Sequence, residues 1–234
     1  MSLTPRDRKV ILHLGYHGWL SHRQIGLLEF PYEGKQDFDY SYQTLQRRTR
    51  EELLKNKWID REYLPDKEGN ITTIFRLSRK GVKLFNRDTN KKALRPRFSQ
   101  LKVPHRLEVN DVLTSLKTSD TISINGFELE KKLGSIRPDA YVKYKTPFCL
   151  EIDLSGGEIE SFIKNKWQQY EKEYMQDNLK CNYVVWYSDR SNQLYKWIDK
   201  QTNLEPLFID LKPNEIFKVI SYINPGIKSA INSM

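Results

Sequence analysis

Three acidic side chains fall where two successive strands of one sheet are expected. Asp139 follows Pro138 at the start of one predicted strand, and Glu151 and Asp153 lie two residues apart on the next. Alternate residues of a strand project to the same side, so Glu151 and Asp153 share a face, and a hairpin could bring Asp139 beside them. Carboxylates at that density bind Mg²⁺ or Mn²⁺, which can activate water and stabilise charge on a cleaved phosphodiester. The spacing thus indicates metal-dependent phosphodiester hydrolysis.

These residues give the chain a resemblance to the PD-(D/E)xK nuclease fold, carried by the segment SIRPDAYVKYKTPFCLEID. In that fold an aspartate after proline and an acid on the following strand hold the metal, and a lysine two residues later assists. Asp139 and Glu151 match the two acids, while Asp153 stands in the place of the lysine. The resemblance implies Mg²⁺ as the cofactor, with Asp139 and Glu151 as its ligands and Asp153 or Glu108 as supplementary ligands.

The missing lysine has a candidate substitute, because some members of that superfamily carry it on the following helix. Lys164 and Lys166 lie there, and the resemblance favours Lys166. Glu108, on the preceding helix, matches an extra helical acid found in several such nucleases. The candidate catalytic residues are Asp139, Glu151, Asp153, Lys166 and Glu108.

Two other interpretations of the acidic residues stay open. They could be ordinary strand-end or surface carboxylates, or the fold could be nuclease-like without activity. An enzyme predicts carboxylates that converge on an open cleft, whereas a non-enzymatic module predicts carboxylates that are dispersed or engaged in salt bridges.

The elements that must position these residues alternate between helix and strand after residue 104. The pattern predicts an α+β protein whose second domain has a short mixed central sheet and is restriction-endonuclease-like. The expected helices cover 105–116, 157–174, 191–198 and 213–223, and the expected strands 127–132, 140–144, 148–152, 183–187 and 207–209.

The first hundred residues carry the whole charge excess of the chain. They contain 21 lysines and arginines against 12 aspartates and glutamates, and the remaining residues balance, so the net charge of +9 lies here. A surplus confined to one segment suggests a surface for a polyanion, since neutralised phosphates release counterions. A basic but inert surface is the alternative.

The same hundred residues have the signals of three helices, a hairpin and a further helix. Thr4, Pro5 and Asp7 begin the first helix, Ser41 caps the third, and Ser78 caps the last. Between the last two helices, a run around Trp58 to Tyr63 and another over 71–75 flank turn residues and predict a hairpin.

This order resembles winged helix-turn-helix domains, in which the third helix enters the major groove of DNA and the hairpin wing touches the backbone or minor groove. The resemblance implies double-stranded DNA as a partner, although some winged helices bind proteins instead. We expect a winged-helix domain over 1–88, a basic linker over 89–104 and the nuclease-like domain over 105–234. The implied DNA-binding residues are Gln43, Gln46, Arg47 and Arg50 on the third helix and Lys67 and Arg76 on the wing.

Nearly the full length also resembles the replication-relaxation family of plasmid and mobile-element proteins. The resemblance rests on the winged helix, on PHRLEVNDVLTSL, and on IRPDAYVKY followed by FCLEIDLSGGEIESFIKNKWQQY. It implies a DNA-binding protein that acts in replication, mobilisation or their control, with replication or mobilisation proteins as partners and a homodimer as one oligomeric state to test. The alternative is a non-enzymatic regulator whose second domain dimerises or recruits a partner.

Several function classes find no support in the sequence. It has no GxxxxGK[ST] phosphate loop, no GxGxxG fingerprint and no histidine pair of the rolling-circle nickase type. No apolar run approaches a membrane span, so we expect a cytoplasmic protein without membrane contact. Cys149 and Cys181 lack the spacing of a zinc site or a disulfide framework and are interpreted as core residues.

Overall fold

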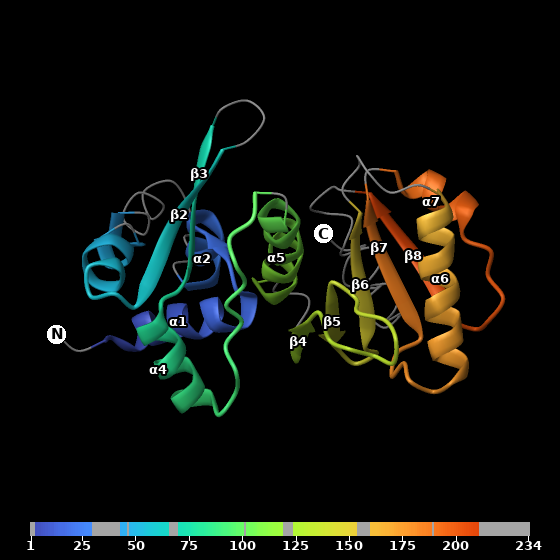
Figure 1. Ribbon diagram of the computed structural model, residues 1–234, viewed down its shortest axis with the longest axis horizontal. Coiled ribbons are helices and arrows are strands. Elements are labelled where there is room, and N and C mark those ends of the chain that lie inside the picture. The colour runs from blue at the N-terminus through green and yellow to red at the C-terminus, as the bar shows by residue number, and fades with distance from the viewer. Residues whose placement is uncertain are drawn as a thin grey trace, which may run out of the picture. The chain divides into compact units, whose positions relative to one another are not determined.

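The computed structural model describes residues 3–29, 43–45, 47–65, 70–100, 102–118, 124–153, 160–188 and 190–210. The chain forms two compact units, residues 1–114 and residues 115–234, whose elements are labelled in Figure 1. Within the described ranges, no helix combines the length and the apolar character that crossing a membrane requires. Gln46 and Lys67 lie outside the described residues, as do the predicted cap Ser41 and the helix predicted over 213–223. Only the backbone of Arg50 is described.

The first unit begins with a helix whose start follows the predicted capping signals. Helix α1 (Pro5–His17) is capped by Thr4, whose hydroxyl accepts a hydrogen bond from the Asp7 amide at 3.2 Å. Asp7 returns the bond by accepting from the Thr4 amide at 2.9 Å. This capping box satisfies two amides that the first helical turn leaves without partners, and it confirms the predicted helix start.

A short strand and two further helical segments follow α1. Strand β1 (Leu20–Ser21) leads directly into helix α2 (His22–Glu29). Residues 43–45 and 47 are helical, and they lead into the π-helical segment η1 (Arg48–Leu54). The helix predicted after Ser41 is therefore present in its described part, but it widens to the π form and ends at Leu54.

The predicted hairpin is confirmed as strands β2 (Ile59–Pro65) and β3 (Ile71–Leu77), which pair antiparallel. Strand β1 joins on the other side of β3, giving the order β1-β3-β2. The hairpin projects past the helices of this unit (Figure 1). Helix α4 (Arg79–Thr89) follows, and the Ser78 hydroxyl caps it by accepting from the Gly81 amide at 3.1 Å.

Helices α1 and α4 pack closely over the core of the first unit. Gly15 on α1 faces the ring of Phe85 on α4, and a Cβ at position 15 would overlap that ring. Ile11 and Leu14 from α1 are buried with Phe75 from β3 in the same apolar cluster. A glycine at the crossing point therefore lets the two helices approach.

The segment predicted as a linker, residues 89–104, is packed against the first unit instead. Ala93 is buried in the apolar cluster of this unit, and the Leu94 amide donates to the Gly15 carbonyl at 2.8 Å. These two anchors stand between exposed basic residues. Composition alone therefore indicates a solvated linker where the backbone is in fact fixed.

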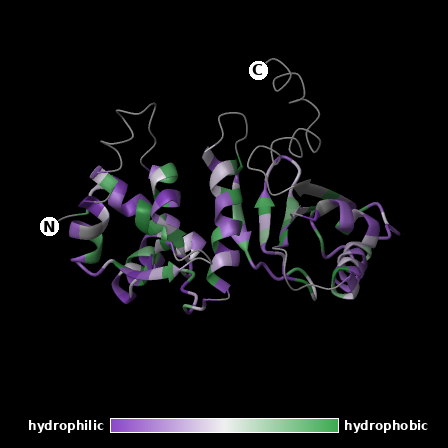
Figure 2. Ribbon diagram, turned by 90° about the horizontal axis from the view of Figure 1, so that it is seen from above, coloured by the Kyte–Doolittle hydropathy of each residue, from purple (hydrophilic) through white to green (hydrophobic). Residues whose placement is uncertain are grey.

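Helix α5 (Lys102–Thr118) also begins as part of the first unit, so the division between the units falls at 114 rather than at the predicted 105. Val103 is buried beside Trp19, and the Asn110 amide group donates to the Trp19 carbonyl at 2.5 Å. Figure 2 shows hydrophilic and hydrophobic residues alternating along α5. The apolar residues of this helix complete a core that the hairpin and α1 leave open.

The second unit is built on a mixed five-stranded sheet in the order β4-β5-β6-β7-β8. The first three strands, β4 (Gly126–Leu129), β5 (Ala140–Lys143) and β6 (Phe148–Asp153), are antiparallel. The last three, β6, β7 (Tyr183–Ser188) and β8 (Glu205–Asp210), are parallel. This is the mixed α+β architecture that the sequence predicts.

Two helices connect the parallel strands. Helix α6 (Glu160–Met175) joins β6 to β7 and lies along the sheet (Figure 1), while α7 (Ser191–Trp197) joins β7 to β8. Ile163, Trp167 and Tyr170 project from one face of α6 into the apolar cluster, where they meet Val184 of β7. Every residue of β6 is buried, so acidic side chains on that strand are held in the interior.

Candidate active site

Glu151 and Asp153 lie at the carboxyl end of β6, where the strand runs parallel to β7. Glu151 is opposite Trp186 and Asp153 is opposite Ser188 in the strand register. Their spacing puts both side chains on one face of the sheet. Both carboxylates are buried, Glu151 with only 1% of its surface exposed. Buried carboxylates need partners, and the partners here come from three different elements.

Asp139 reaches the same strand from the neighbouring one. It directly precedes β5, which pairs with β6 so that Ala140 is opposite Leu150. One carboxylate oxygen of Asp139, Oδ2, accepts the Ile152 amide at 2.8 Å. The hairpin thus brings Asp139 beside the strand segment between Glu151 and Asp153.

Helix α6 supplies both hydrogen-bond partners of Glu151. Lys166 Nζ donates to Glu151 Oε2 at 2.7 Å, and the Tyr170 hydroxyl donates to Oε1. The two donors lie one helical turn apart and therefore project from the same face of α6. Lys164, the other lysine considered on this helix, instead pairs with Glu160 one turn earlier.

Burial and neighbouring charges determine the protonation of the Glu151 carboxyl group. Burial raises the pKa of Glu151 from 4.5 to about 7; the positive charge of Lys166 opposes the rise, and the negative charge of Asp139 adds to it. Burial also raises the pKa of Tyr170 well above its ordinary value, with the Glu151 charge adding to the effect. Tyr170 therefore keeps its proton and acts as the donor.

Asp153 is engaged differently from its neighbour two residues earlier. Arg190, just beyond β7, donates through Nε to Oδ2 at 2.7 Å and through Nη2 to Oδ1 at 2.8 Å. The Ser188 hydroxyl donates to Oδ2 at 2.7 Å. Burial raises the pKa of Asp153, but the hydrogen bonds from Arg190 and Ser188 outweigh burial and hold that pKa below its usual value. Both oxygens of Asp153 thus accept bonds from the protein.

The three carboxylates do not gather around one point. Across the described ranges, no group of three or more histidine, cysteine, aspartate or glutamate side chains is arranged to hold a metal ion. Asp139 and Glu151 are neighbours, close enough for the negative charge of Asp139 to raise the pKa of Glu151. Asp153 has its own salt bridge to Arg190, with Lys166 close enough to lower the Asp153 pKa further.

A third residue of α6 holds the loop that leads into Asp139. Glu173 Oε1 accepts the amide of Ser135 at 2.9 Å and its hydroxyl at 2.6 Å. Gly134, with φ of +59°, sits so close to the Glu173 carboxylate that a Cβ there would overlap it. Lys166, Tyr170 and Glu173 are spaced four and three residues apart, so one face of α6 positions both the strand carboxylate and the loop.

Glu108, the fifth catalytic candidate, lies in the part of α5 that belongs to the first unit. It lines a groove with residues of α2, β2 and β3, and Asp111 lines the same groove one turn later. Burial raises the pKa of Glu108, the charge of Asp111 adds to this, and Arg23 opposes it. The described residues around Glu108 therefore belong to the first unit.

Sequence reasoning missed four residues that hold this site together. Tyr170 has a visible signal, because it belongs to an aromatic stripe with Trp167 and Tyr174 that predicts core packing. Tyr170 is indeed buried in the core, yet its hydroxyl reaches Glu151. The other three are Ser188, Arg190 and Glu173, whose contacts depend on strand register and on the fold of the loop.

The candidate DNA-binding residues of the first unit fall into two groups. Gln43 and Arg47 are exposed on the helical segment before η1. Arg76 is instead largely enclosed: its guanidinium lies 4.9 Å from the centre of the Trp19 ring and Nη1 donates to the Pro96 carbonyl at 3.2 Å. The side chain of Arg76 thus connects the hairpin to the segment before α5.

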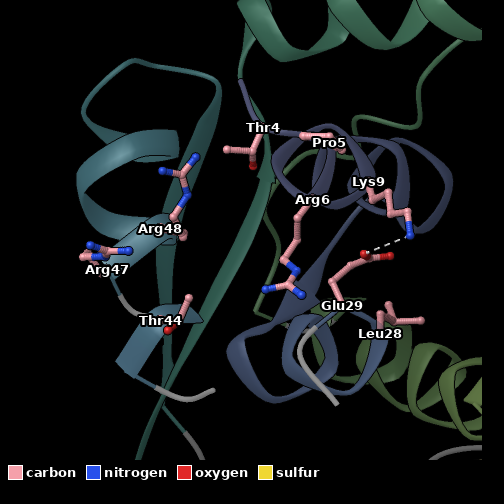
Figure 3. A pocket seen from close by; sticks show the side chains of 9 residues that line it. All are labelled: Thr4, Pro5, Arg6, Lys9, Leu28, Glu29, Thr44, Arg47 and Arg48. Atoms are coloured by element: carbon pink, nitrogen blue, oxygen red, sulfur yellow. Dashed lines mark ion pairs between the residues drawn. The ribbon is translucent and has the colours of Figure 1, made fainter. Parts of the chain in front are cut away.

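A basic hollow of about 700 Å³ lies beside Arg47 (Figure 3). Its lining combines the start of α1, the end of α2, the helical segment before η1 and the first residue of η1. Among the described contacts at this hollow, Lys9 lies 3.9 Å from Glu29, and Arg48 pairs with Asp7. The lining basic residues are Arg6, Lys9, Arg47 and Arg48.

Comparison with known proteins gives one structural likeness and one family. The small subunit of a heterodimeric restriction endonuclease resembles this chain with 17% identity and a TM-score of 0.33, covering 53% of this chain and 70% of its own. No curated protein matches the chain significantly. Residues 12–185 match the family described as replication-relaxation, a stretch that contains most of both units and the residues Asp139, Glu151 and Lys166. Since the match covers well over half of the sequence, the chain belongs to the replication-relaxation family.

Proposed function

We propose that this protein binds double-stranded DNA through its first unit and hydrolyses phosphodiester bonds with a divalent-cation site in its second. The observation that carries the proposal is the meeting of Asp139, Glu151 and Lys166 at the end of β6. In PD-(D/E)xK nucleases, which this chain resembles, two acids hold the metal and one lysine assists. Here the lysine comes from α6 rather than from the strand.

The residues present fit a magnesium ion. Mg²⁺ is commonly held by one or two carboxylates, with water and substrate phosphate completing its coordination. Asp139 and Glu151 offer two neighbouring carboxylates, and the charge of one raises the pKa of the other, so a bound cation would relieve their repulsion. When bound, the ion supplies Lewis acidity that activates water and offsets the charge of the phosphate.

The remaining groups prepare the site for a phosphodiester. Lys166, with 28% of its side chain exposed, reaches from Glu151 toward solvent and is suited to stabilise negative charge that develops on the phosphate. Tyr170 fixes the orientation of Glu151 by donating to Oε1, the oxygen that Lys166 does not bind. Asp153 holds Arg190, which adds a second cation at the same strand end.

The order of elements in the first unit supports the DNA-binding half of the proposal. A helix, a short strand, two helical segments, a projecting hairpin and a closing helix follow one another as in winged helix-turn-helix domains. Gln43 and Arg47 are exposed on the segment that corresponds to the recognition helix. The charge excess of residues 1–100 supports a polyanionic partner.

Family membership supports a role in DNA replication. Within the proposal, the protein acts in the replication or mobilisation of a plasmid or other mobile element, or in their control, together with replication or mobilisation proteins.

One test of the nuclease is incubation of the purified chain with supercoiled and linear duplex DNA in Mg²⁺, in Mn²⁺ and in chelator. The critical variant is Asp139→Asn, whose amide oxygen can still accept the Ile152 amide while its charge is lost. Asp177→Asn is a matched control, because Asp177 is exposed and pairs with Lys180 at the end of α6. We expect metal-dependent cleavage by the wild type and the control, and none by Asp139→Asn.

A second candidate function, a non-enzymatic regulator with a nuclease-like module, is favoured by one observation. Both oxygens of Glu151 and both of Asp153 accept bonds from protein donors, so these carboxylates are satisfied without a cation. DNA that is retarded but intact in every lane would decide for this candidate. Equal cleavage by wild type and Asp139→Asn would show that any activity arises elsewhere.

The DNA-binding half is tested by the affinity of Arg47→Ala for duplex DNA at several salt concentrations. Removing one phosphate-contacting cation should weaken binding and reduce the salt slope by about one. Lys83→Ala, an exposed substitution on α4, is the matched control and should leave both quantities unchanged. Equal behaviour of the two variants would contradict a DNA contact at Arg47.

A further inference from the structure

Two thiols that lie far apart in the sequence meet at the base of the parallel strands. Cys149 is on β6 and Cys181 precedes β7, and their sulfur atoms are 3.5 Å apart. Neither is part of a disulfide, and both are buried. Their spacing in the sequence gives no indication of this pairing, because the contact depends on the register of β6 and β7.

The two thiols are chemically unequal. A hydrogen bond joins the Cys149 and Cys181 sulfur atoms. The same hydrogen bond lowers the pKa of Cys181, and the amides of Tyr183 and Cys149 lower it further against the effect of burial. Cys181 is thus the better nucleophile of the pair.

Cys181 also lies nearer to solvent. It is 4% exposed, whereas Cys149 is completely buried. Its two chain neighbours, Lys180 and Asn182, are both exposed. Cys181 is therefore the thiol that a small oxidant would meet first, with the Cys149 sulfur 3.5 Å away from it.

We propose that Cys149 and Cys181 form an intramolecular disulfide when the protein meets hydrogen peroxide. The Cys181 thiolate attacks one peroxide oxygen, which forms a sulfenic acid and releases one water after protonation. Cys149 then attacks the Cys181 sulfur, forming the S–S bond and releasing the sulfenic oxygen as a second water. The two thiols lose two electrons and the peroxide gains them, so the step is balanced.

The geometry requires only a small movement. A disulfide bond is about 2.05 Å long, so the sulfur atoms must approach by about 1.5 Å from their present separation. Side-chain rotation and a slight shift of the residues before β7 can supply this approach. The link would join β6, which carries Glu151 and Asp153, to the beginning of β7.

The test is the mass of the full-length protein after treatment with hydrogen peroxide, followed by quenching, unfolding in urea and alkylation. We expect a species that is about 2 Da lighter than the reduced chain and takes up no alkylating agent. Digestion should yield one linked peptide pair that contains Cys149 and Cys181, and dithiothreitol should restore two alkylatable thiols.

Two single variants separate the roles of the thiols. Cys149→Ala should stop at a Cys181 sulfenic acid, which dimedone traps, whereas Cys181→Ala should leave Cys149 largely unmodified. Two alkylated thiols in the treated wild type, or oxidation to sulfinic acid without a linked peptide, would overturn the proposal. The wild-type measurement decides the matter even if a variant fails to fold, and it does not depend on nuclease activity.

Discussion

Glu151 is held between opposing influences. Desolvation favours its protonated form, while Lys166 and Tyr170 favour the carboxylate. Its pKa of about 7 means that the folded protein binds this proton more tightly than the unfolded chain, in which the ordinary value is 4.5. A nearby cation would favour the ionised form of this carboxyl group and lower its pKa. Ionisation of the group without such a cation lowers the stability of the folded protein.

The first prediction concerns that cost. A raised carboxyl pKa contributes stability that is present below pH 4.5 and lost as pH rises to about 7. Glu151→Gln, which stays neutral, should therefore become more stable relative to wild type between pH 5.5 and pH 8, by on the order of 1–3 kcal/mol. Urea unfolding of both proteins at the two pH values measures this. A stability difference that does not change with pH would contradict it.

The second prediction isolates the Tyr170 hydroxyl. Its hydrogen bond lowers the Glu151 pKa, so Tyr170→Phe should raise that pKa. Binding of Mn²⁺ at neutral pH should then weaken several-fold, because more of the carboxyl is protonated, and should recover at higher pH. Tyr174→Phe, four residues further along α6 and partly buried, is the matched control. Titration by calorimetry across pH separates this shift from a simple loss of folding, which would not recover.

At the scale of elements, the strand period and a fold resemblance predict a good part of the candidate site. Period two places Glu151 and Asp153 on one face, and the proline before Asp139 marks the strand start that brings it beside β6. Lys166, which the resemblance to PD-(D/E)xK nucleases favours rather than any spacing, contacts the same strand from α6. Each of these contacts depends on one element and its immediate neighbour.

The remaining contacts could not be predicted in the same way. Arg190 meets Asp153 only because β6 and β7 are parallel and Ser188 is opposite Asp153. A shift of that register by one residue would turn Ser188 away from Asp153. Residues 89–104 have the composition of a linker. The backbone hydrogen bond from the Leu94 amide to the Gly15 carbonyl holds them in place, and such a bond cannot be inferred from composition.

The third prediction tests α6 as the element that positions the loop before Asp139. Gly134→Ala forces a Cβ against the Glu173 carboxylate at a φ that favours glycine, so it should lower the free energy of unfolding by about 1–3 kcal/mol. Gly126→Ala is the control, because Gly126 also has a positive φ, +133°, but open space around its Cβ position. Chemical denaturation compares the two. A loss at Gly126 equal to that at Gly134 would show that backbone strain alone is responsible and that the Glu173 contact is unimportant.

At the scale of the whole molecule, the chain separates a basic unit from a unit that carries the acidic site. Helix α5 belongs to both by its bounds, but its first half completes the first unit. Trp19, Leu64 and Ile74 form an apolar cluster that Val103 closes, with Phe98 and Leu107 packed against it. Gln24 and Asn110 add hydrogen bonds between α5 and the rest of that unit. The first unit is thus incomplete without residues that composition assigns to the linker and to the second domain.

The last prediction follows from that dependence. A fragment of residues 1–118 should unfold cooperatively, whereas residues 1–100 should be less stable by about 2–5 kcal/mol, because Val103 and Leu107 no longer cover the cluster around Trp19. Urea denaturation followed by tryptophan fluorescence measures the stability of each fragment, since Trp19 lies in the cluster that Val103 and Leu107 cover. Asn110→Ala in the longer fragment should lie between the two, because it removes the bond to the Trp19 carbonyl but keeps the apolar contacts. Equal stability of the two fragments would instead put the end of the first unit before α5, where the charge pattern alone suggests it.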